Sequence, residues 1–416
     1  MRINLRPQLP AFVTLPTSKS ISARALIVNA LAERPCTLHG LSDCDDTKAV
    51  LKALASDDTL VDIGAAGTAM RFLTAYYSTR EGEEHLLTGS ERMKHRPIGI
   101  LVDALRTLGA DIEYAAEEGF PPLLIRGRKL QGGSVSIKAS VSSQYISALL
   151  MLGPTLAEGL TLKLEGEIAS RPYIEMTLQL MRQFGAEATF EGQTIRVAPG
   201  SYVRTAHYNV EPDWSAASYW YELVALTPDS AARVVLSGLS AESLQGDSIC
   251  ARYFGHLGVR TEFTSEGAVL TKAVREIPTI ANACATTCEP LVLDFSACPD
   301  LAQTFVVTAA LMRRPFRFCG LHSLRIKETD RIAALIAELA KLGVIIREEV
   351  PGELSYVGTE QDSAVPTTAV PSIATYEDHR MAMAFAPAAY LFPGLNIEHP
   401  EVVSKSYPAY WQDLPL

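Results

Sequence analysis

Charged side chains gather at the start of a predicted helix at residues 327–331, which read KETDR. The apolar residues that follow recur at the helical spacing of three and four positions. A helix start carries amide N–H groups without helical partners and a partial positive charge, so it attracts anions and disfavours lysine and arginine. Basic residues nevertheless occupy the first or second turn of several predicted helices: Lys19, Arg24, Arg71, Lys327, Arg331 and Arg380. An anionic ligand at these helix starts would explain the arrangement.

Small and hydroxyl-bearing residues stand at the same helix starts. Gly67 and Thr68 lie in GAAGTAMR, and Ser142, Ser143 and Gln144 lie in SVSSQYIS. Such residues let an oxyanion approach backbone N–H groups closely. Each one alone has a simpler explanation, because a serine often only caps a helix and a single arginine is usually a surface residue. Their repetition in one acidic chain favours an anion-binding active site.

Two carboxylates accompany these basic residues. Asp300 opens an apolar predicted helix, and Glu328 lies between Lys327 and Arg331. Nearby cations favour the ionised form of a carboxylate, so Glu328 is a candidate for proton transfer; the alternative is an ion-pair network at the surface. The sequence has no Walker loop, dinucleotide-binding glycine fingerprint, zinc-protease HExxH or hydrolase GxSxG motif.

A recurring unit of helix, glycine and strand would position these residues. Apolar runs near residues 98–108, 173–184, 249–257 and 331–342 end at Gly109, Gly185, Gly258 and Gly343, and each is followed by a strand-like segment. Further helices are expected at 18–33, 67–78, 142–153, 214–226 and 300–312, and strands at 134–139, 160–166, 232–238 and 394–399. The alternation predicts an α/β protein with about six such units, three in each of two domains.

Composition limits the class of protein. The chain has 416 residues, enough for two domains of roughly 200 residues. Its net charge of −10 and the lack of a basic stripe argue against nucleic-acid binding. We expect a cytoplasmic protein, because no signal peptide or membrane span is recognisable.

The seven cysteines are scattered, which indicates reduced thiols rather than a disulfide framework. Cys284, Cys288 and Cys298 form a local cluster, with Cys319 and His322 further along. A zinc site is one interpretation of this cluster, but the spacing lacks a second tight ligand pair. We therefore expect ordinary thiols and no metal.

Taken together, the motifs resemble the 5-enolpyruvylshikimate-3-phosphate synthase family. They are TSKSISARAL, GAAGTAMRFLTA, LTGSERMKHRPIGILVDAL, SVSSQYISALLM, SRPYIEMT, KETDRIAAL, DHRMAMAFA and SKSYP, in the order of that family. The resemblance runs from about residue 17 to residue 408. It implies an enolpyruvyl transferase-like inside-out α/β barrel of two similar domains, each made of three βαβαββ units and joined by a double crossover. The domains would comprise residues 17–210, and residues 1–16 plus 211–416.

The resemblance also implies a reaction. Shikimate 3-phosphate would attack C2 of phosphoenolpyruvate through its 5-hydroxyl while C3 gains a proton, and phosphate would then leave the tetrahedral intermediate. Both substrates are anions, which gives the basic helix starts a purpose. No metal or organic cofactor, no nucleic acid and no membrane is implied, and we expect a monomer whose domains close on the substrates.

The roles of individual residues are likewise what the resemblance implies. Asp300, Glu328 and Lys19 would be catalytic, with Asp300 taking the proton of the attacking hydroxyl. Shikimate 3-phosphate would be bound by Lys19, Ser20, Arg24, Ser142, Ser143, Gln144, Ser170, Tyr173, Asp300, Ser323 and Lys327. Phosphoenolpyruvate would be bound by Lys19, Gly67, Arg96, Gln144, Arg331, Arg380 and Lys405.

The sequence departs from the family pattern at two of these motifs. Ala65 and Ser323 stand where many relatives have asparagine. The first puts the fine shape of the phosphoenolpyruvate pocket in doubt, and the second the contact of Ser323 with shikimate. Gly67, which would leave the pocket uncrowded, implies inhibition by glyphosate.

Two other functions are weighed against this interpretation. The first is the sister transferase that acts on a UDP-sugar, whose members usually carry a reactive cysteine in a mobile loop. The matching segment here, GSERMKHRP, contains none. The second is a non-catalytic anion-binding protein, which would be expected to lack Asp300, Glu328 or the basic residues.

Overall fold

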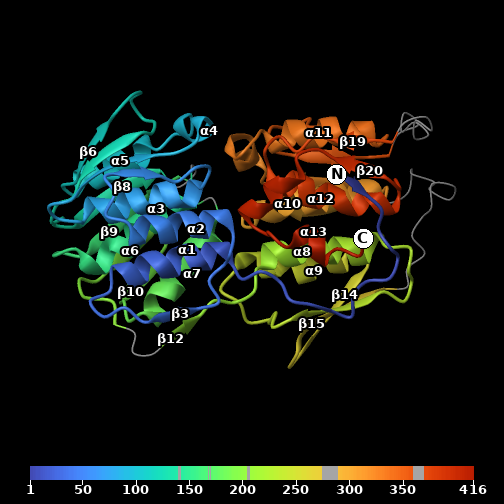
Figure 1. The fold of residues 1–416 in the computed structure, drawn as a ribbon, viewed down its shortest axis with the longest axis horizontal. Helices are drawn as coiled ribbons and strands as arrows, with labels where there is room; N and C mark the ends of the chain where they lie inside the picture. Colours follow the sequence, from blue (N-terminus) through green and yellow to red (C-terminus); the bar gives the residue numbers. More distant parts are fainter. Residues whose placement is uncertain (139–141, 167, 169, 204–206, 274–288, 359–369) are drawn as a thin grey trace. The chain divides into compact units, whose positions relative to one another are not determined.

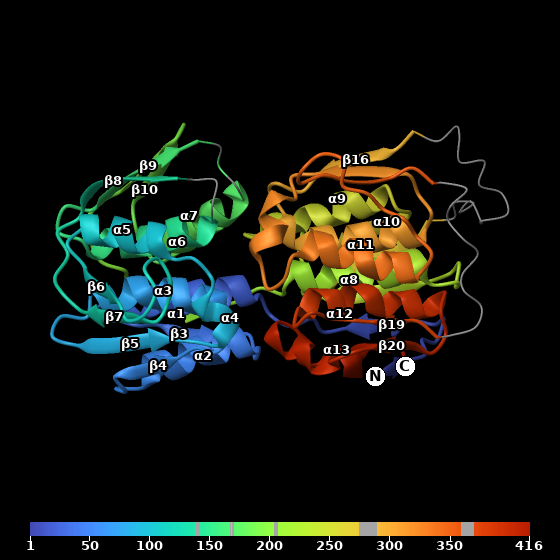
Figure 2. The same cartoon turned by 90° about the horizontal axis from the view of Figure 1, so that it is seen from above.

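The chain folds into two compact units. The computed structural model describes residues 1–138, 142–166, 168, 170–203, 207–273, 289–358 and 370–416. One unit comprises Thr17–Glu211, and the other comprises Met1–Pro16 together with Pro212–Leu416. We call them the 17–211 unit and the terminal unit. In each, strands lie at the periphery and long helices lie inside (Figures 1 and 2).

Two sheets of the 17–211 unit share one order of elements, βαβαββ, with the first two strands parallel and the others antiparallel. The first sheet, ordered β4-β5-β7-β6, arises from β4 (Leu60–Asp62), α3 (Gly67–Ser78), β5 (Glu84–Thr88), α5 (Gly99–Thr107), β6 (Asp111–Tyr114) and β7 (Leu123–Arg126). The second, ordered β10-β11-β9-β8, arises from β8 (Gly133–Lys138), α6 (Ser143–Leu152), β9 (Leu160–Glu165), α7 (Arg171–Gln183), β10 (Ala188–Glu191) and β11 (Thr194–Val197).

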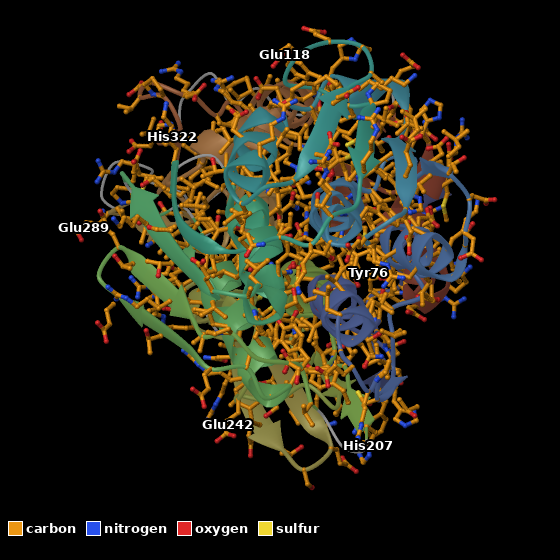
Figure 3. All side chains as sticks on the ribbon, turned by 90° about the vertical axis from the view of Figure 1, so that its left-hand side faces the viewer. Tyr76, Glu118, His207, Glu242, Glu289 and His322 are labelled. Carbon is orange, nitrogen blue, oxygen red and sulfur yellow. The ribbon has the colours of Figure 1, made fainter. Side chains whose placement is uncertain are left out.

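A shorter strand pair completes this unit. The remaining elements are α1 (Lys19–Ala30), β3 (Thr37–His39), α2 (Asp45–Ala55), α4 (Glu91–Lys94), the 3₁₀ turn η1 (Gly153–Thr155) and β12 (His207–Asn209). Strands β3 and β12 pair in parallel. His207 of β12, labelled in Figure 3, faces His39, with ring centroids 5.8 Å apart.

The interior of the 17–211 unit is helical. In α3 every residue except Thr68 is buried, and in α6 every residue after Gln144 is buried. Helix α1 packs against both α3 and α6. A helix that is apolar on all sides is stable only when it is surrounded by protein, which explains why these runs lie inside and the sheets outside.

The terminal unit repeats the architecture with three sheets, ordered β14-β15-β13-β2, β16-β17-β18 and β1-β20-β19. Its strands are β1 (Arg2–Ile3), β2 (Phe12–Val13), β13 (Arg233–Ser237), β14 (Val259–Thr264), β15 (Gly267–Lys272), β16 (Leu291–Asp294), β17 (Phe316–Cys319), β18 (Leu354–Tyr356), β19 (Ser372–Ile373) and β20 (Leu395–Ile397). Its helices are α8 (Trp214–Leu226), α9 (Cys250–Gly255), α10 (Ala302–Leu311), α11 (Arg331–Lys341), α12 (His379–Phe385) and α13 (Tyr410–Asp413). Shorter 3₁₀ turns are η2 (Gly246–Ile249), η3 (Pro299–Leu301), η4 (His322–Ile326), η5 (Ala386–Tyr390) and η6 (Pro400–Lys405). Helices α10 and α12 are buried along their whole length and pack on each other.

The predicted alternation of helices and strands is confirmed at most positions. Gly109, Gly185, Gly258 and Gly343 all have positive φ just beyond a helix, as expected for residues that end helices. The strand predicted after Gly343 is wrong. Residues 344–347 form no named strand, because this segment exchanges backbone hydrogen bonds with the neighbouring β18 only at Arg347 and Ser355.

Within the described residues, no helix is both long and apolar enough to cross a membrane.

Candidate active site

Three buried helices of the 17–211 unit begin with the residues that the sequence marks as an anion site. Ser18 caps α1 by accepting a hydrogen bond from the Ile21 amide at 3.4 Å. Ser142 caps α6 and accepts from the Gln144 amide at 3.2 Å. The Gln144 side chain donates to the Thr68 hydroxyl at 3.1 Å, so the starts of α3 and α6 lie side by side. The helix starts thus converge at one end of the unit's core.

Lys19 begins α1 and contacts an acidic partner that the sequence did not reveal. Its Nζ lies 3.3 Å from Oδ2 of Asp46, in the first turn of α2. The two side chains are 14% and 6% exposed, so water screens the pair only weakly. The ammonium of Lys19 is therefore held in place at the start of α1 before any ligand arrives.

Gly67, the first residue of α3, leaves space for Arg96. A β-carbon built on Gly67 would lie 2.5 Å from Nη1 of Arg96, closer than atoms can approach. Arg71, one turn further along α3, donates to the Gly67 carbonyl at 3.2 Å and to the Pro97 carbonyl at 3.0 Å. Arg71 thereby ties the segment that carries Arg96 to the start of α3.

Arg24 is buried, and its side chain forms hydrogen bonds with other residues of the 17–211 unit. Its guanidinium donates to the Thr177 hydroxyl at 2.7 Å, the Ser20 carbonyl at 2.8 Å and the Ser147 hydroxyl at 3.2 Å. Burial lowers the pKa of Arg24 to about 10, and the nearby Tyr173 opposes this effect. These bonds join α1, α6 and α7, so the structure shows Arg24 bracing the helices that begin with the other candidate residues.

The start of α7 contributes two of the predicted residues. Ser170 immediately precedes the helix in a left-handed conformation, with φ of 55°. Tyr173 lies in the first turn, and its carbonyl accepts a hydrogen bond from the Thr177 hydroxyl at 2.8 Å. Thr177 also accepts a hydrogen bond from Arg24 of α1. The start of α7, with Ser170 and Tyr173, therefore belongs to the same group of helix starts.

In the terminal unit, Arg331 is the centre of a cluster of charges. It is the first residue of α11, is 1% exposed, and contacts three carboxylates. Nε lies 2.7 Å from Asp378 Oδ2, Nη2 lies 2.9 Å from Glu328 Oε2, and Nη1 lies 3.4 Å from Asp300 Oδ1. Burial by itself would lower the pKa of Arg331, but the three carboxylates, Asp378 foremost, outweigh it and raise the pKa.

Asp300, in the 3₁₀ turn η3 before α10, is surrounded by cations. Besides Arg331, it lies 3.1 Å from Nη2 of Arg380 and 3.6 Å from Nζ of Lys327. Its side chain is 21% exposed, so a solute can reach it. A carboxylate in this setting can accept the proton of an approaching hydroxyl, while the surrounding cations can hold an anion.

Glu328 is the second carboxylate at the edge of the cluster. It contacts Nζ of Lys405, in η6, at 3.0 Å as well as Arg331. Lys327 and Glu328 were predicted to open a helix, and this is wrong. Helix α11 begins only at Arg331, because Asp330 caps it by accepting from the Ala333 amide at 3.1 Å. Ser323 lies earlier, in η4.

Three carboxylates near these side chains were missed as site residues. An aspartate in a first helical turn is common, so Asp46 gave no signal. Asp378 caps α12 by accepting from the Arg380 amide, and an aspartate is an ordinary helix cap. Asp247 lies in η2, where it accepts a hydrogen bond from Ser215. Burial, and then the negative charge of Asp300, raise the pKa of Asp247 to about 7.

The cysteine cluster singled out in the sequence lies only partly within the described residues. Cys284 and Cys288 lie outside the described residues, and Cys298 is buried. Within the described ranges, no group of three histidine, cysteine, aspartate or glutamate side chains is arranged to hold a metal ion.

Comparison with known proteins matches nearly the whole chain. The profile of the EPSP synthase (3-phosphoshikimate 1-carboxyvinyltransferase) family matches residues 4–56 and 54–414. A 3-phosphoshikimate 1-carboxyvinyltransferase of Bacteroides fragilis (strain YCH46) is 55% identical over 408 residues, which cover 98% of this chain and 95% of the relative. One of Vibrio cholerae serotype O1 (strain M66-2) is 36% identical over 427 residues, covering 96% and 95%.

Solved structures agree on the fold. EPSP synthase from Acinetobacter baumannii superposes with a TM-score of 0.76 at 22% identity, covering 99% of this chain and 96% of the other. The enolpyruvyl transferase NikO from Streptomyces tendae superposes with a TM-score of 0.69 at 16% identity, with the same coverage. At these identities the likeness concerns the fold alone.

Proposed function

Because the chain belongs to the EPSP synthase (3-phosphoshikimate 1-carboxyvinyltransferase) family, we propose that it transfers the enolpyruvyl group of phosphoenolpyruvate to the 5-hydroxyl of shikimate 3-phosphate and releases phosphate. This is a step of the shikimate pathway toward chorismate and the aromatic amino acids. The observation that carries the proposal is the cluster around Arg331. It combines a carboxylate that water can reach, Asp300, with three cations within 3.6 Å of it.

The phosphate of shikimate 3-phosphate needs hydrogen-bond donors at helix starts. Ser142 and Ser143 at α6 and Ser170 at α7 supply hydroxyl groups there, and the helix starts supply backbone N–H groups. The rest of the group that we assign to this substrate is Lys19, Ser20, Arg24, Gln144, Tyr173, Asp300, Ser323 and Lys327. Arg24 acts through the Ser20 carbonyl and through α6 and α7, to which it is bonded.

Phosphoenolpyruvate carries a phosphate and a carboxylate, and both suit arginine, whose planar fork pairs with two oxygens at once. We assign this task to Arg96, which lies over Gly67, and to Arg331 and Arg380, which contact Asp300. Lys19, Gln144 and Lys405 complete the assignment. An incoming anion exchanges with carboxylates that the arginines already contact, so binding replaces charge pairs rather than creating them.

The two partly buried carboxylates, Asp300 and Glu328, divide the proton transfers. Asp300 takes the proton of the 5-hydroxyl as its oxygen bonds to C2 of phosphoenolpyruvate, and C3 gains a proton. Loss of phosphate from C2 and of a proton from C3 then restores the enol double bond. Glu328, paired with Lys405, is the partner acid for C3, and Lys19 stabilises the negative charge of the substrates.

The proposal is tested by incubating the full chain with phosphoenolpyruvate and either shikimate 3-phosphate or a UDP-sugar. Phosphate release is followed, and the product is identified by mass spectrometry. We expect release only with shikimate 3-phosphate, together with the mass of the enolpyruvyl ether. Release only with the UDP-sugar, or tight binding of shikimate 3-phosphate without turnover, would overturn it. A monomeric state and a cytoplasmic location remain predictions, which size-exclusion chromatography with light scattering and cell fractionation test.

A further inference from the structure

A short turn of unusual backbone precedes α12. Residues 374–378 join β19 to this helix, and within them Tyr376 and Glu377 have φ of 54° and 57°. Two consecutive residues with side chains in the left-handed region cost free energy, because the β-carbon crowds the backbone. Such a turn persists only when surrounding contacts hold it, so those contacts indicate what the turn is for.

The first anchor of the turn is Glu338. This residue of α11 is fully buried, and its carboxylate accepts hydrogen bonds from the Ala374 amide at 3.1 Å and from the Tyr376 hydroxyl at 2.6 Å. Lys341 reaches the same carboxylate at 2.6 Å from the outer side. Glu338 thus fixes both the beginning and the strained middle of the turn.

The second anchor is Asp378, which is also fully buried. Oδ2 accepts from Nε of Arg331 at 2.7 Å, and Oδ1 accepts from Nη2 of Arg331 at 3.3 Å. Oδ1 also accepts from the backbone amide of Arg380 at 2.9 Å. One carboxylate therefore orients the side chain of one arginine and the backbone of another.

Both anchors use one face of α11, because Glu338 belongs to this helix and Asp378 binds Arg331, its first residue. Arg331 and Glu338 are seven residues apart, which is two helical turns or about 10 Å along the axis. The turn is held along this face at both ends. Arg380, at the end of the turn, then reaches Asp300 through Nη2 at 3.1 Å and lies 3.4 Å from the Tyr219 hydroxyl through Nη1.

We propose that the turn 374–378 is a positioning device that sets the two arginines of the terminal unit, Arg331 and Arg380, for the phosphate and carboxylate of phosphoenolpyruvate. Asp378 and Glu338 are its positioning residues, and neither touches the substrate. The inference rests on the proposed function, because it assumes that these arginines bind phosphoenolpyruvate. It predicts that loosening the turn weakens this substrate selectively.

The first test is Asp378→Asn. Asparagine keeps one oxygen for the Arg380 amide but cannot accept from Arg331 with both atoms. Since hydrogen bonds to charged groups are strong, we expect KM for phosphoenolpyruvate to rise roughly tenfold or more, and KM for shikimate 3-phosphate to stay within about twofold. A merely structural role would lower Tm and the active fraction, hence apparent kcat, without moving either KM.

The second test changes the contact between the turn and its other anchor, Glu338. Tyr376→Phe removes one hydrogen bond to Glu338 from a side chain that is 39% exposed, so folding should survive. We expect KM for phosphoenolpyruvate to rise by about threefold. Lys341→Met is the matched control, because it removes another partner of Glu338 and leaves both bonds to the turn. It should leave both KM values unchanged even if Tm falls.

The outcomes separate this inference from the proposed function. Wild-type chain that fails to turn over both substrates refutes the proposed function. Suppose instead that the wild type turns over both substrates, and that KM for phosphoenolpyruvate stays within twofold of wild type in Asp378→Asn and in Tyr376→Phe. This result refutes the positioning role and leaves the proposed function intact. If Asp378→Asn does not fold, KM for phosphoenolpyruvate in Tyr376→Phe decides whether the turn has a positioning role. Equal rises in both KM values would also overturn the selective role.

Discussion

The guanidinium of Arg96 occupies the space that a side chain at position 67 would need. A β-carbon on Gly67 would lie 2.5 Å from Nη1, 3.1 Å from Cζ and 3.2 Å from Nη2 of Arg96. The clash is with the far end of a flexible side chain, so it can be relieved by moving Arg96 rather than the backbone. Gly67 therefore matters through the position of the arginine above it.

Gly67→Ala should displace Arg96 and raise KM for phosphoenolpyruvate by about three- to tenfold, with little change in Tm or in KM for shikimate 3-phosphate. Steady-state kinetics and a thermal melt measure this. Gly99→Ala is the control, since Gly99 also begins a helix but a β-carbon there would meet its nearest neighbour at an ordinary 3.4 Å. An unchanged KM for phosphoenolpyruvate in Gly67→Ala would remove Arg96 from this substrate's site.

The same position bears on inhibition. Wild type, with Gly67, should be inhibited by glyphosate in competition with phosphoenolpyruvate, and Gly67→Ala should be inhibited less, because the displaced Arg96 alters the site. Inhibition constants at several phosphoenolpyruvate concentrations measure both effects. Inhibition of the wild type that does not depend on phosphoenolpyruvate would contradict the expectation.

Glu328 is placed between two cations, Arg331 at 2.9 Å and Lys405 at 3.0 Å. Glu328→Gln keeps the size of the side chain and removes its ability to exchange a proton. We expect kcat to fall roughly 10²-fold or more while substrate binding stays largely intact, as is typical when an acid–base group is lost. Single-turnover kinetics and equilibrium binding measure the two effects separately. Glu349→Gln, an exposed residue of the same unit, should behave as wild type, and an unchanged kcat in Glu328→Gln would exclude Glu328 from the mechanism.

The sequence predicted those site residues whose type is unusual for their place. A lysine or arginine at a helix start, as at Lys19, Arg331 and Arg380, conflicts with the helix dipole and therefore draws attention. Gly67 and Ser142 joined them because glycine and serine suit a close anion. The repeated spacing of apolar residues likewise revealed most helices and the number of repeated units.

Residues whose type is ordinary for their place could not be found in this way. Asp46 obeys the dipole rule, and its contact with Lys19 depends on how α1 and α2 pack. Asp378 is an ordinary cap of α12, but its pairing with Arg331, 47 positions earlier in the chain, follows only from the fold. The bonds by which Arg24 joins three helices likewise follow only from the fold, since its partners Ser147 and Thr177 lie 123 and 153 positions away in the chain.

Lys19 should contribute to the binding of both substrates. Lys19→Ala removes the ammonium at the start of α1 and should raise KM for shikimate 3-phosphate and for phosphoenolpyruvate, each by roughly tenfold or more. Asp46→Asn keeps the ammonium but releases its 3.3 Å partner, so we expect a smaller rise in both values. Lys48→Ala, on the exposed side of α2, is the control for lost positive charge. A normal KM for either substrate in Lys19→Ala would contradict a shared role.

Asp247 should make the stability of the terminal unit depend on pH. Burial, and then the charge of Asp300, raise its pKa from the usual 3.8 to about 7. The folded state therefore holds a proton that the unfolded state releases above pH 4, and the free energy of unfolding should fall as pH rises toward 7. Asp247→Asn keeps an oxygen to accept from Ser215 and has no proton to lose. Relative to wild type, the free energy of unfolding of the variant should rise by about 4 kcal/mol between pH 4 and pH 8.

Urea unfolding at intervals of half a pH unit measures this difference. The variant and wild type should diverge progressively from about pH 4 and run parallel above about pH 8, because the carboxyl is then ionised in both states of the wild type. Glu242→Gln, a substitution of the exposed carboxylate labelled in Figure 3, is the control and should follow the wild type across the range. A constant difference between Asp247→Asn and wild type at every pH would show that Asp247 has the same pKa in the folded and unfolded states, because the Ser215 hydrogen bond and the charge of Arg380 then compensate its burial.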